Sequence, residues 1–339
     1  MNLAETMRIH EPYPGLFAYY DGRIEGKRLH SDKPNWLDDG AYSLGVASYA
    51  IVSGTDALVY DTHISFDHAR AIRSHLSDLG VRHIRVVLSH WHTDHVAGNA
   101  GFIDCPILSN KLTRNTLIEK RKVLAEKDPP INPVVMPTET FEGETVLEVG
   151  DITVKLMQFD IHSADGTVLL LPHLGVLLAG DTLEDSVTYI SEPDNTTRHI
   201  AELERLATLD FVRILPNHGD EQVIAAGGYP PSLVTATRDY LTRLLARLDD
   251  PTLETESLQS FIAPELEAGT LTYFAPYEKD GSVETVKQNL TGDTRNPWDP
   301  ARTPGGSSGG AAVAAVTGMS VPSVARTAAA TIWPNRRRL

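Results

Sequence analysis

The sequence predicts an α/β fold in which two β-sheets pack against each other and helices cover the outside. Strand and helix patterns alternate from about Gly45 onward, and a second set of such patterns begins near Asp151. Polar residues directly follow several of the apolar strands. The carboxyl ends of strands are where α/β folds place their ligands, so we expect a functional site at one edge of the sheets.

The first set contains two strands, a helix and a third strand. Residues 46–52 and 57–61 have the composition of strands and are joined by turn-forming residues. Residues 67–79 carry apolar side chains at helical spacing. Residues 84–89 form an apolar run, which predicts a buried strand.

The second set contains four strands and two helices. The runs typical of strands are 151–160, 167–172, 175–181 and 211–216, and those typical of helices are 198–208 and 232–248. The last helix is amphipathic, with leucines and a tyrosine on one face. A sheet from each set has one apolar face to bury, and packing the two sheets together buries both.

The composition restricts partners and compartment. The 339 residues carry a formal net charge of −15. Such a surface repels phosphate backbones and anionic membranes, so we expect neither nucleic acid nor a membrane as a partner. No apolar run reaches transmembrane length, the N-terminus has no signal-peptide pattern, and the single cysteine, Cys105, excludes an internal disulfide. These features predict a cytoplasmic protein with a small-molecule substrate, and they leave a homo-oligomer open.

The segment HWHTDH, residues 90–95, places three imidazoles and a carboxylate within six positions. Side chains two residues apart on an extended segment point the same way, so His90 and His92 can reach one metal ion. Asp94 and His95 lie where the chain turns toward the next helix and can face a second point nearby. Imidazole and carboxylate are the usual ligands of zinc and iron, although a polar loop after a strand is the alternative interpretation.

Three further candidate metal ligands come directly after apolar runs of the sequence. They are His162 in FDIHSADG, Asp181 in LLAGDTL and His218 in ILPNHGD. Each one alone can be a loop residue. Their shared position at strand ends predicts that they line the same rim as HWHTDH and complete its ligand shell.

The order His-x-His-x-Asp-His, His, Asp, His resembles the signature of the metallo-β-lactamase superfamily, over roughly residues 15–290. The resemblance implies an αββα four-layer sandwich for a domain of residues 1–290. It also implies two metal sites that share a bridging carboxylate. One metal ion takes His90, His92 and His162, the other takes Asp94, His95 and His218, and Asp181 bridges them.

By the same resemblance the site holds two divalent metal ions, with Zn²⁺ as the first choice and iron or manganese as alternatives. Two metal ions about 3.5–4 Å apart can share a hydroxide that attacks a carbonyl or phosphoryl centre. Asp94 is then the expected catalytic residue, because it can orient this nucleophile or take its proton.

Four residues are candidates for supporting or substrate-contacting roles. Asp61 in VYDT resembles the family's strand-end Asp-Thr-Gly and is expected to hold a ligand by hydrogen bonding, with a strand-end cap as the alternative. His63 replaces the usual glycine and is either a substrate contact or a loop residue. Tyr189 and Tyr229 can contact the substrate, and packing roles are slightly favoured for both.

Asp181 also narrows the predicted activity. True β-lactamases generally lack a bridging aspartate at this position, whereas lactonases and glyoxalase II-like thioesterases retain it. The sequence therefore predicts hydrolysis of an ester, a lactone or a related carbonyl compound. The alternatives are a mononuclear iron enzyme similar to the sulfur dioxygenases, a β-lactam hydrolase, and a non-catalytic metal-binding protein.

Residues 291–339 are rich in Ala, Gly, Ser, Thr and Pro and have no convincing period, which is typical of a linker or tail. Within them, residues 294–318 resemble the opening of the amidase signature, and Ser307 and Ser308 match its Gly-Gly-Ser-Ser-Gly-Gly loop. No later Gly-Gly-Ser run follows, and about 45 residues cannot rebuild an amidase core. We therefore expect a remnant left by a gene fusion, a truncation or a frameshift.

Deletion of residues 295–339 is expected to leave hydrolysis intact, because no predicted ligand lies in that segment. The measurement is kcat/KM of the shortened and the full chain, both loaded with metal. Loss of activity in a shortened chain that still folds and holds its metal would contradict the remnant interpretation.

Overall fold

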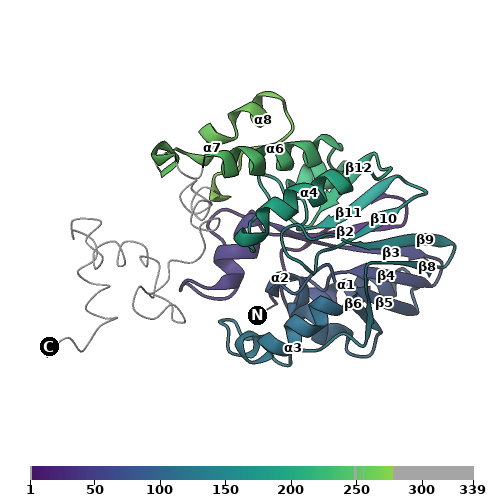
Figure 1. The fold of residues 1–339 in the computed structure, drawn as a ribbon. Helices are drawn as coiled ribbons and strands as arrows, with labels where there is room; N and C mark the ends of the chain where they lie inside the picture. The colour runs from purple at the N-terminus through teal and green to yellow at the C-terminus, as the bar shows by residue number, and fades with distance from the viewer. Residues whose placement is uncertain (1, 248–249, 255, 278–339) are drawn as a thin grey trace, which may run out of the picture.

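The computed structural model describes residues 2–247, 250–254 and 256–277. Two sheets pack face to face, and helices cover the outer face of each (Figure 1). The predicted order of layers, helix, sheet, sheet and helix, is confirmed. The predicted domain boundary at residue 290 and the amidase-like segment lie outside the described residues.

The first sheet has seven strands in the order β1-β2-β3-β4-β5-β6-β7. They are β1 (Arg8–Tyr13), β2 (Leu16–Asp21), β3 (Val46–Ser53), β4 (Asp56–Tyr60), β5 (His83–Val87), β6 (Ile107–Asn110) and β7 (Glu139–Phe141). The pairings from β1 to β4 are antiparallel and those from β4 to β7 are parallel. Parallel pairs need long crossovers, and α1 (Phe66–Asp78) and α3 (Lys111–Ala125) lie in two of them.

The second sheet has five strands in the order β12-β11-β10-β9-β8. They are β8 (Glu144–Val149), β9 (Ile152–Gln158), β10 (Thr167–Leu171), β11 (Val176–Gly180) and β12 (Arg213–Pro216). Only β11 and β12 are parallel, and α4 (Thr196–Leu206) connects them. The other helices are α2 (Thr93–Val96), α5 (Glu221–Ala225), α6 (Ser232–Ala246), α7 (Leu258–Phe261) and α8 (Ala263–Glu267). No helix in the described ranges combines the length and the apolar character needed to cross a bilayer.

All strands and helices predicted within residues 46–89 and 151–248 are confirmed, and their ends agree to within two residues. The sequence patterns did not predict β1, β2, β6, β7, β8 or α3. Strand β2 is buried on both faces, so it shows no polar alternation. Strands β6 and β7 have only four and three residues, too few for a periodic pattern.

Alternation along β2 divides its side chains between two hydrophobic cores. Ala18 and Tyr20 belong to the core between the sheets. Phe17 and Tyr19 face α1 instead, and both rings contact His75 at centroid distances of 5.0 and 5.6 Å. One strand thereby joins the inner core to the outer helical layer.

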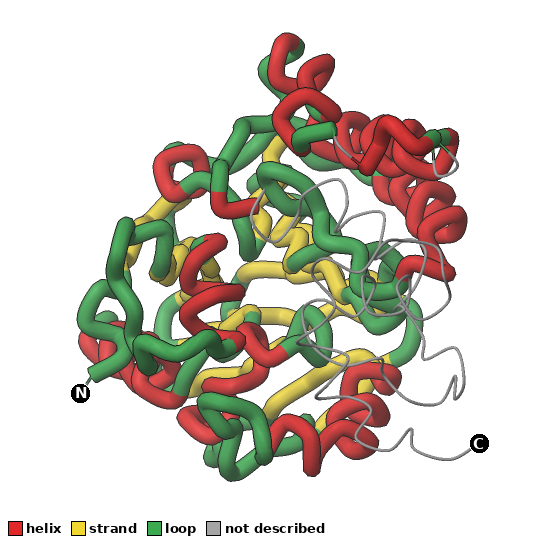
Figure 2. The backbone as a smooth tube through the Cα atoms, turned by 90° about the vertical axis from the view of Figure 1, so that its left-hand side faces the viewer, coloured by secondary structure: helices red, strands yellow, loops and turns green. Residues whose placement is uncertain are grey.

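Tyrosines of the first sheet tie it to the second. Each donates a hydrogen bond from its hydroxyl to a backbone carbonyl oxygen at the edge where the functional residues were expected. The pairs are Tyr20 with Gly219 at 3.0 Å, Tyr49 with Pro216, and Tyr60 with Thr167. Figure 2 looks onto this edge, where loops and short helices surround the ends of the strands.

We expect Gly98→Ala to lower the free energy of unfolding by about 3 kcal/mol, because overpacking in a rigid core has this magnitude. A Cβ atom at Gly98 would lie 1.9 Å from the Thr62 carbonyl oxygen and 2.9 Å from the Ala69 Cβ. Urea unfolding measures the loss. Gly40→Ala is the matched control, since its added Cβ meets nothing within 4 Å, and an equal loss in both variants would contradict the packing argument.

Candidate metal centre

The fold brings the seven predicted ligands together at one edge of the two sheets. His90, His92, Asp94 and His95 come from the loop after β5 and from α2, and the others follow β9, β11 and β12. They form two groups, in each of which the candidate ligand atoms lie within 4.8 Å of one another. One group is His90, His92, His162 and Asp181, and the other is Asp94, His95, Asp181 and His218.

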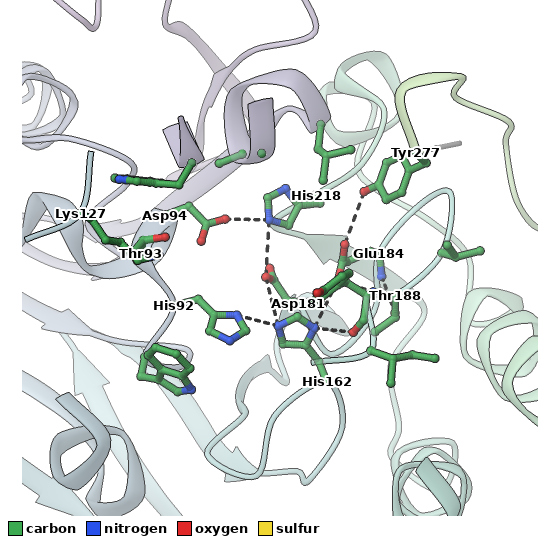
Figure 3. A pocket seen from close by; sticks show the side chains of 18 of the residues that line it. His92, Thr93, Asp94, Lys127, His162, Asp181, Glu184, Thr188, His218 and Tyr277 are labelled. Atoms are coloured by element: carbon green, nitrogen blue, oxygen red, sulfur yellow. Dashed lines mark hydrogen bonds and ion pairs between the residues drawn. The ribbon is translucent and has the colours of Figure 1, made fainter. Parts of the chain in front are cut away.

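Asp181 lies at the centre of both groups (Figure 3). Its Oδ2 atom is close to the Nε2 atoms of four imidazoles, two from each group. The distances are 3.0 Å to His95, 3.5 Å to His90, 3.5 Å to His218 and 3.7 Å to His162. A single carboxylate oxygen therefore lies within reach of both proposed metal positions.

The outer nitrogens of these four imidazoles are held by the protein. The Nδ1 atoms lie 2.9 Å from Ser89 Oγ for His90, 3.0 Å from Asp61 Oδ2 for His95, 2.8 Å from the Tyr189 carbonyl oxygen for His162, and 2.7 Å from the Gly45 carbonyl oxygen for His218. Metal-binding histidines characteristically use one nitrogen for the metal and anchor the other in this way. The anchors turn every one of these Nε2 atoms inward.

Asp61 connects three strand ends. Its Oδ1 accepts a hydrogen bond from the Ser89 backbone N–H at 2.7 Å, and its Oδ2 accepts one from Asn217 Nδ2 at 2.6 Å besides contacting His95. The residue is fully buried and has a φ of 65°. This left-handed conformation is uncommon outside glycine and tends to persist at functional sites. The expected hydrogen bond between Asp61 and a candidate ligand is present, with His95 Nδ1 as the donor, and Asn217 is a partner that sequence patterns did not single out.

Two of the residues suggested as substrate contacts or as loop and packing residues, His63 and Tyr229, lie outside the cavity at the site. His63 is fully buried, its ring stacks on His68 at 4.4 Å, and it does not line the cavity at the site. Tyr229 is also buried outside that cavity, and its hydroxyl donates to Asp185 Oδ2 at 2.9 Å. Tyr189 does line the cavity, and its backbone carbonyl anchors His162.

The histidines of the first group, His90, His92 and His162, have lowered pKa values, which favours binding of a cation. Burial, together with the neighbouring imidazoles, holds the pKa of His90 well below its ordinary value. Burial and the adjacent His162 lower the pKa of His92 to about 3. Burial also lowers the pKa of His162. Three neutral imidazoles therefore face one another, and neutral imidazole is the form that binds metal.

The second group contains the negative charge. Burial alone would raise the pKa of Asp94 and Asp181, but the surrounding imidazoles, above all His95 and His218, together outweigh it and hold the pKa of both carboxyls well below their usual range. Burial likewise opposes protonation of His95 and His218, yet Asp181 and the other carboxylates around the site together outweigh it and raise the pKa of both imidazoles. In the metal-free protein, the protons on His95 and His218 supply the positive charge that the buried carboxylates require.

Two buried polar atoms at the centre lack hydrogen-bond partners among the described residues, which is the arrangement expected where a cation binds. His90 Nε2 and Asp181 Oδ1 are buried and have no hydrogen-bond partner within the described part of the chain. A buried polar atom without a partner is costly, and coordination to a metal ion removes the cost. The donor set of imidazole nitrogens and carboxylate oxygens suits zinc, iron or manganese.

A third group, Asp160, Glu192 and His199, lies outside this centre. Arg198 already supplies a cation there, since its Nε is 2.6 Å from Asp160 Oδ2. Both Glu192 carboxylate oxygens accept hydrogen bonds, from the Ala164 backbone and from Asn195. Asp160 Oδ1 and His199 Nε2 lie 3.4 Å apart and have no hydrogen-bond partner among the described residues, so this group is only partly satisfied by the protein.

A cavity of about 470 Å³ opens over the centre. Its walls are mainly apolar, and they include Trp36, Leu44, Trp91, Val187, Ile190, Tyr240 and Tyr277. Cavities of this size and character commonly bind small molecules. Glu184 and Lys127 also line it, and sequence reasoning assigned neither a role. Burial and the nearby Asp181 raise the pKa of Glu184 to about 8.

The family model described as "Metallo-beta-lactamase superfamily" matches residues 42–218, which are 177 of the 339 residues. The chain belongs to the metallo-beta-lactamase superfamily. Membership and the two His/Asp groups together support a metal-dependent hydrolase that uses divalent metal ions. A second family model, "Amidase", matches residues 281–325, outside the described residues.

Solved structures of metallo-beta-lactamases share this superfamily member's fold. A metallo-beta-lactamase from Pontibacter korlensis is 16% identical, with a TM-score of 0.54 over 70% of this chain and 99% of that one. DIM-1 metallo-beta-lactamase exposed to ceftazidime is 19% identical, with a TM-score of 0.52 over 70% and 97% of the two chains. VMB-1 is 14% identical, with a TM-score of 0.53 over 71% and 99%. At these identities the likeness concerns the fold alone. A comparison with curated proteins returned no match.

Asp61→Asn is expected to weaken metal affinity by about 10- to 100-fold, the usual effect of losing an anchor of a metal ligand. Asparagine tolerates the left-handed backbone, but an amide nitrogen in place of Oδ2 cannot accept a hydrogen bond from Asn217 or His95, and turning the amide over leaves the Ser89 N–H without its acceptor. Competition with a chromophoric chelator measures the affinity.

Asp165→Asn is the control for the Asp61 variant. Asp165 is buried near the site, and burial raises its pKa to about 6, so it is mainly ionised at neutral pH and an amide removes a buried negative charge there. Its Oδ1 accepts a hydrogen bond from Ser163, and it contacts none of the proposed ligands. Equal loss of affinity in both variants would contradict a specific role for Asp61.

Proposed function

We propose that the protein is a dinuclear metal hydrolase that cleaves an ester, a lactone or a related carbonyl compound of small size. Zn²⁺ is the metal we propose, with one ion held by His90, His92 and His162, the other by Asp94, His95 and His218, and Asp181 shared between them. The observation that carries this proposal is Asp181 Oδ2, which lies 3.0–3.7 Å from imidazoles of both groups.

Two bound divalent ions would polarise a carbonyl oxygen and lower the pKa of a shared water to about 7. The protein's own residues supply the geometry. Asp94 Oδ2 lies 3.1 Å from His218 Nε2 and 3.4 Å from His95 Nε2, which fixes its carboxylate. Asp94 also lines the cavity, so it can orient the attacking water and accept its proton.

The cavity walls determine which molecules reach this point. Trp36 and Trp91 present apolar surface, and Val187 and Ile190 lie in the loop after Asp181. These walls favour an apolar acyl part and reduce the access of bulk water. Glu184 fixes this loop through a hydrogen bond from the Tyr189 backbone N–H at 3.0 Å. No nucleic acid or membrane is proposed as a partner.

The wild-type protein is expected to bind two zinc ions per chain and to hydrolyse members of a panel of lactones, thioesters and simple esters faster than β-lactams. Elemental analysis of the reconstituted protein gives the metal content, and pH-stat titration gives the rates. One iron per chain with oxygen consumption on a thiol or persulfide would instead support the dioxygenase alternative. Two zinc ions with preferred β-lactam cleavage would support the lactamase alternative.

Asp181→Ala is expected to reduce the bound zinc to one ion or less and to lower kcat/KM by about 100-fold or more, since metal-based charge stabilisation contributes several kcal/mol. Elemental analysis and initial rates on the best substrate of the panel measure the two effects. A variant that keeps two zinc ions and full activity would contradict the shared site. Asp165→Asn again serves as the buried-aspartate control.

A further inference from the structure

The cavity over the metal centre has a cationic group on its wall. Lys127 follows α3. Among the described residues that line the cavity, it is the only lysine, and none of them is an arginine. It lies on the same side of the cavity as Thr93 and Asp94, away from Tyr277 (Figure 3). Its Nζ stands 5.7 Å from the ring centroid of Trp36, another lining residue.

The protein does not neutralise this lysine. Among the described residues, Lys127 Nζ forms no ion pair and no hydrogen bond; burial lowers its pKa, and the more distant carboxylate of Asp94 only partly opposes this shift. The adjacent Asp128 is engaged elsewhere, with its Oδ1 2.8 Å from His30 Nε2. An ammonium group that is partly buried without a carboxylate partner is a costly arrangement that an anionic ligand can relieve.

The loop that carries Lys127 is fixed in place. Trp36 Nε1 donates a hydrogen bond to the Pro129 carbonyl oxygen at 2.8 Å, two residues beyond Lys127. The backbone N–H of Lys127 itself donates to the Leu124 carbonyl oxygen in the last turn of α3, at 3.4 Å. Trp36 thus both lines the cavity and holds the segment that presents the ammonium group.

The charge of the loaded site adds to this effect. With two divalent ions and a shared hydroxide bound, Asp94 and Asp181 would leave a net charge of about +1 at neutral pH, where Glu184 is mainly protonated, and Lys127 would raise it to about +2. The whole protein carries −15. With metal bound, the cavity is therefore a positively charged pocket on an acidic protein. This combination admits a small anion and repels large polyanions.

We propose that the substrate is an apolar ester or lactone that bears one carboxylate, and that Lys127 binds this carboxylate while the apolar part packs on Trp36 and Trp91. This inference rests on the proposed function. A single ammonium with no arginine beside it matches a monoanion better than a phosphate, for which multidentate donors are usual. Lys127 is thereby a specificity residue and takes no part in bond cleavage.

Two esters that differ in one charge test the inference. The hexanoyl ester of 4-hydroxybenzoate carries a carboxylate, and the hexanoyl ester of methyl 4-hydroxybenzoate does not. The measured quantity is the ratio of kcat/KM for the charged ester to kcat/KM for the neutral ester, taken within each protein. Dividing the ratios of variant and wild type removes the difference between the two leaving groups.

In Lys127→Met this ratio is expected to fall about tenfold, mainly through KM of the charged ester, and Lys127→Arg is expected to restore most of it. Lys120→Met is the matched control. Lys120 Nζ lies 4.7 Å from the ring centroid of Trp91, but Lys120 does not line the cavity. An unchanged ratio in Lys127→Met, or an equal fall in Lys120→Met, overturns the inference and leaves the proposed hydrolysis standing.

Calorimetric binding of both esters to the metal-free protein provides a readout without catalysis. The charged ester is expected to bind about tenfold more tightly than the neutral one, and Lys127→Met is expected to abolish the difference. Equal binding of both esters to the wild type, or binding of neither, overturns the inference. If the zinc-loaded protein cleaves neither ester but the metal-free protein retains the binding difference, the proposed function fails and the carboxylate site remains.

Discussion

The site depends on one constraint, the need of a buried carboxylate for positive charge. Asp181 is almost completely buried and has imidazole nitrogens on several sides, with no lysine or arginine in ion-pair contact in the described structure. A buried charge without compensation is strongly destabilising. Protons on His95 and His218 can compensate it, and so can divalent ions. The same arrangement therefore explains why the two groups share an atom and why they are suited to metal.

The rest of the fold holds these groups at fixed positions. Tyrosines of the first sheet donate to carbonyl oxygens of the second, and two of those carbonyls flank His218 in the chain. Asp61 joins the ends of three strands and anchors His95. Because four of the five candidate imidazoles are anchored through Nδ1, their Nε2 atoms cannot turn away without breaking a buried hydrogen bond.

Substrate selection has a different basis from metal binding. The metal ligands lie at strand ends, whereas the cavity walls come from loops and from helix surfaces at distant points of the chain. Lys127 and Trp36 meet there although 91 positions separate them. Loops tolerate change better than the strands they connect, so members of one superfamily can share a centre and differ in the molecules they accept.

The sequence by itself determined seven of the twelve described strands, the helices α1, α4 and α6, and the seven candidate ligands, because hydrophobic periodicity and the placing of polar residues at strand ends are local signals. That these residues bind metal stays a prediction. Only the tertiary structure brought Asn217 to Asp61, excluded His63 and Tyr229 from the cavity, and directed Lys127 and Glu184 toward it. These relations depend on how distant loops fold over the sheet edge, and no local pattern of apolar and polar residues encodes them.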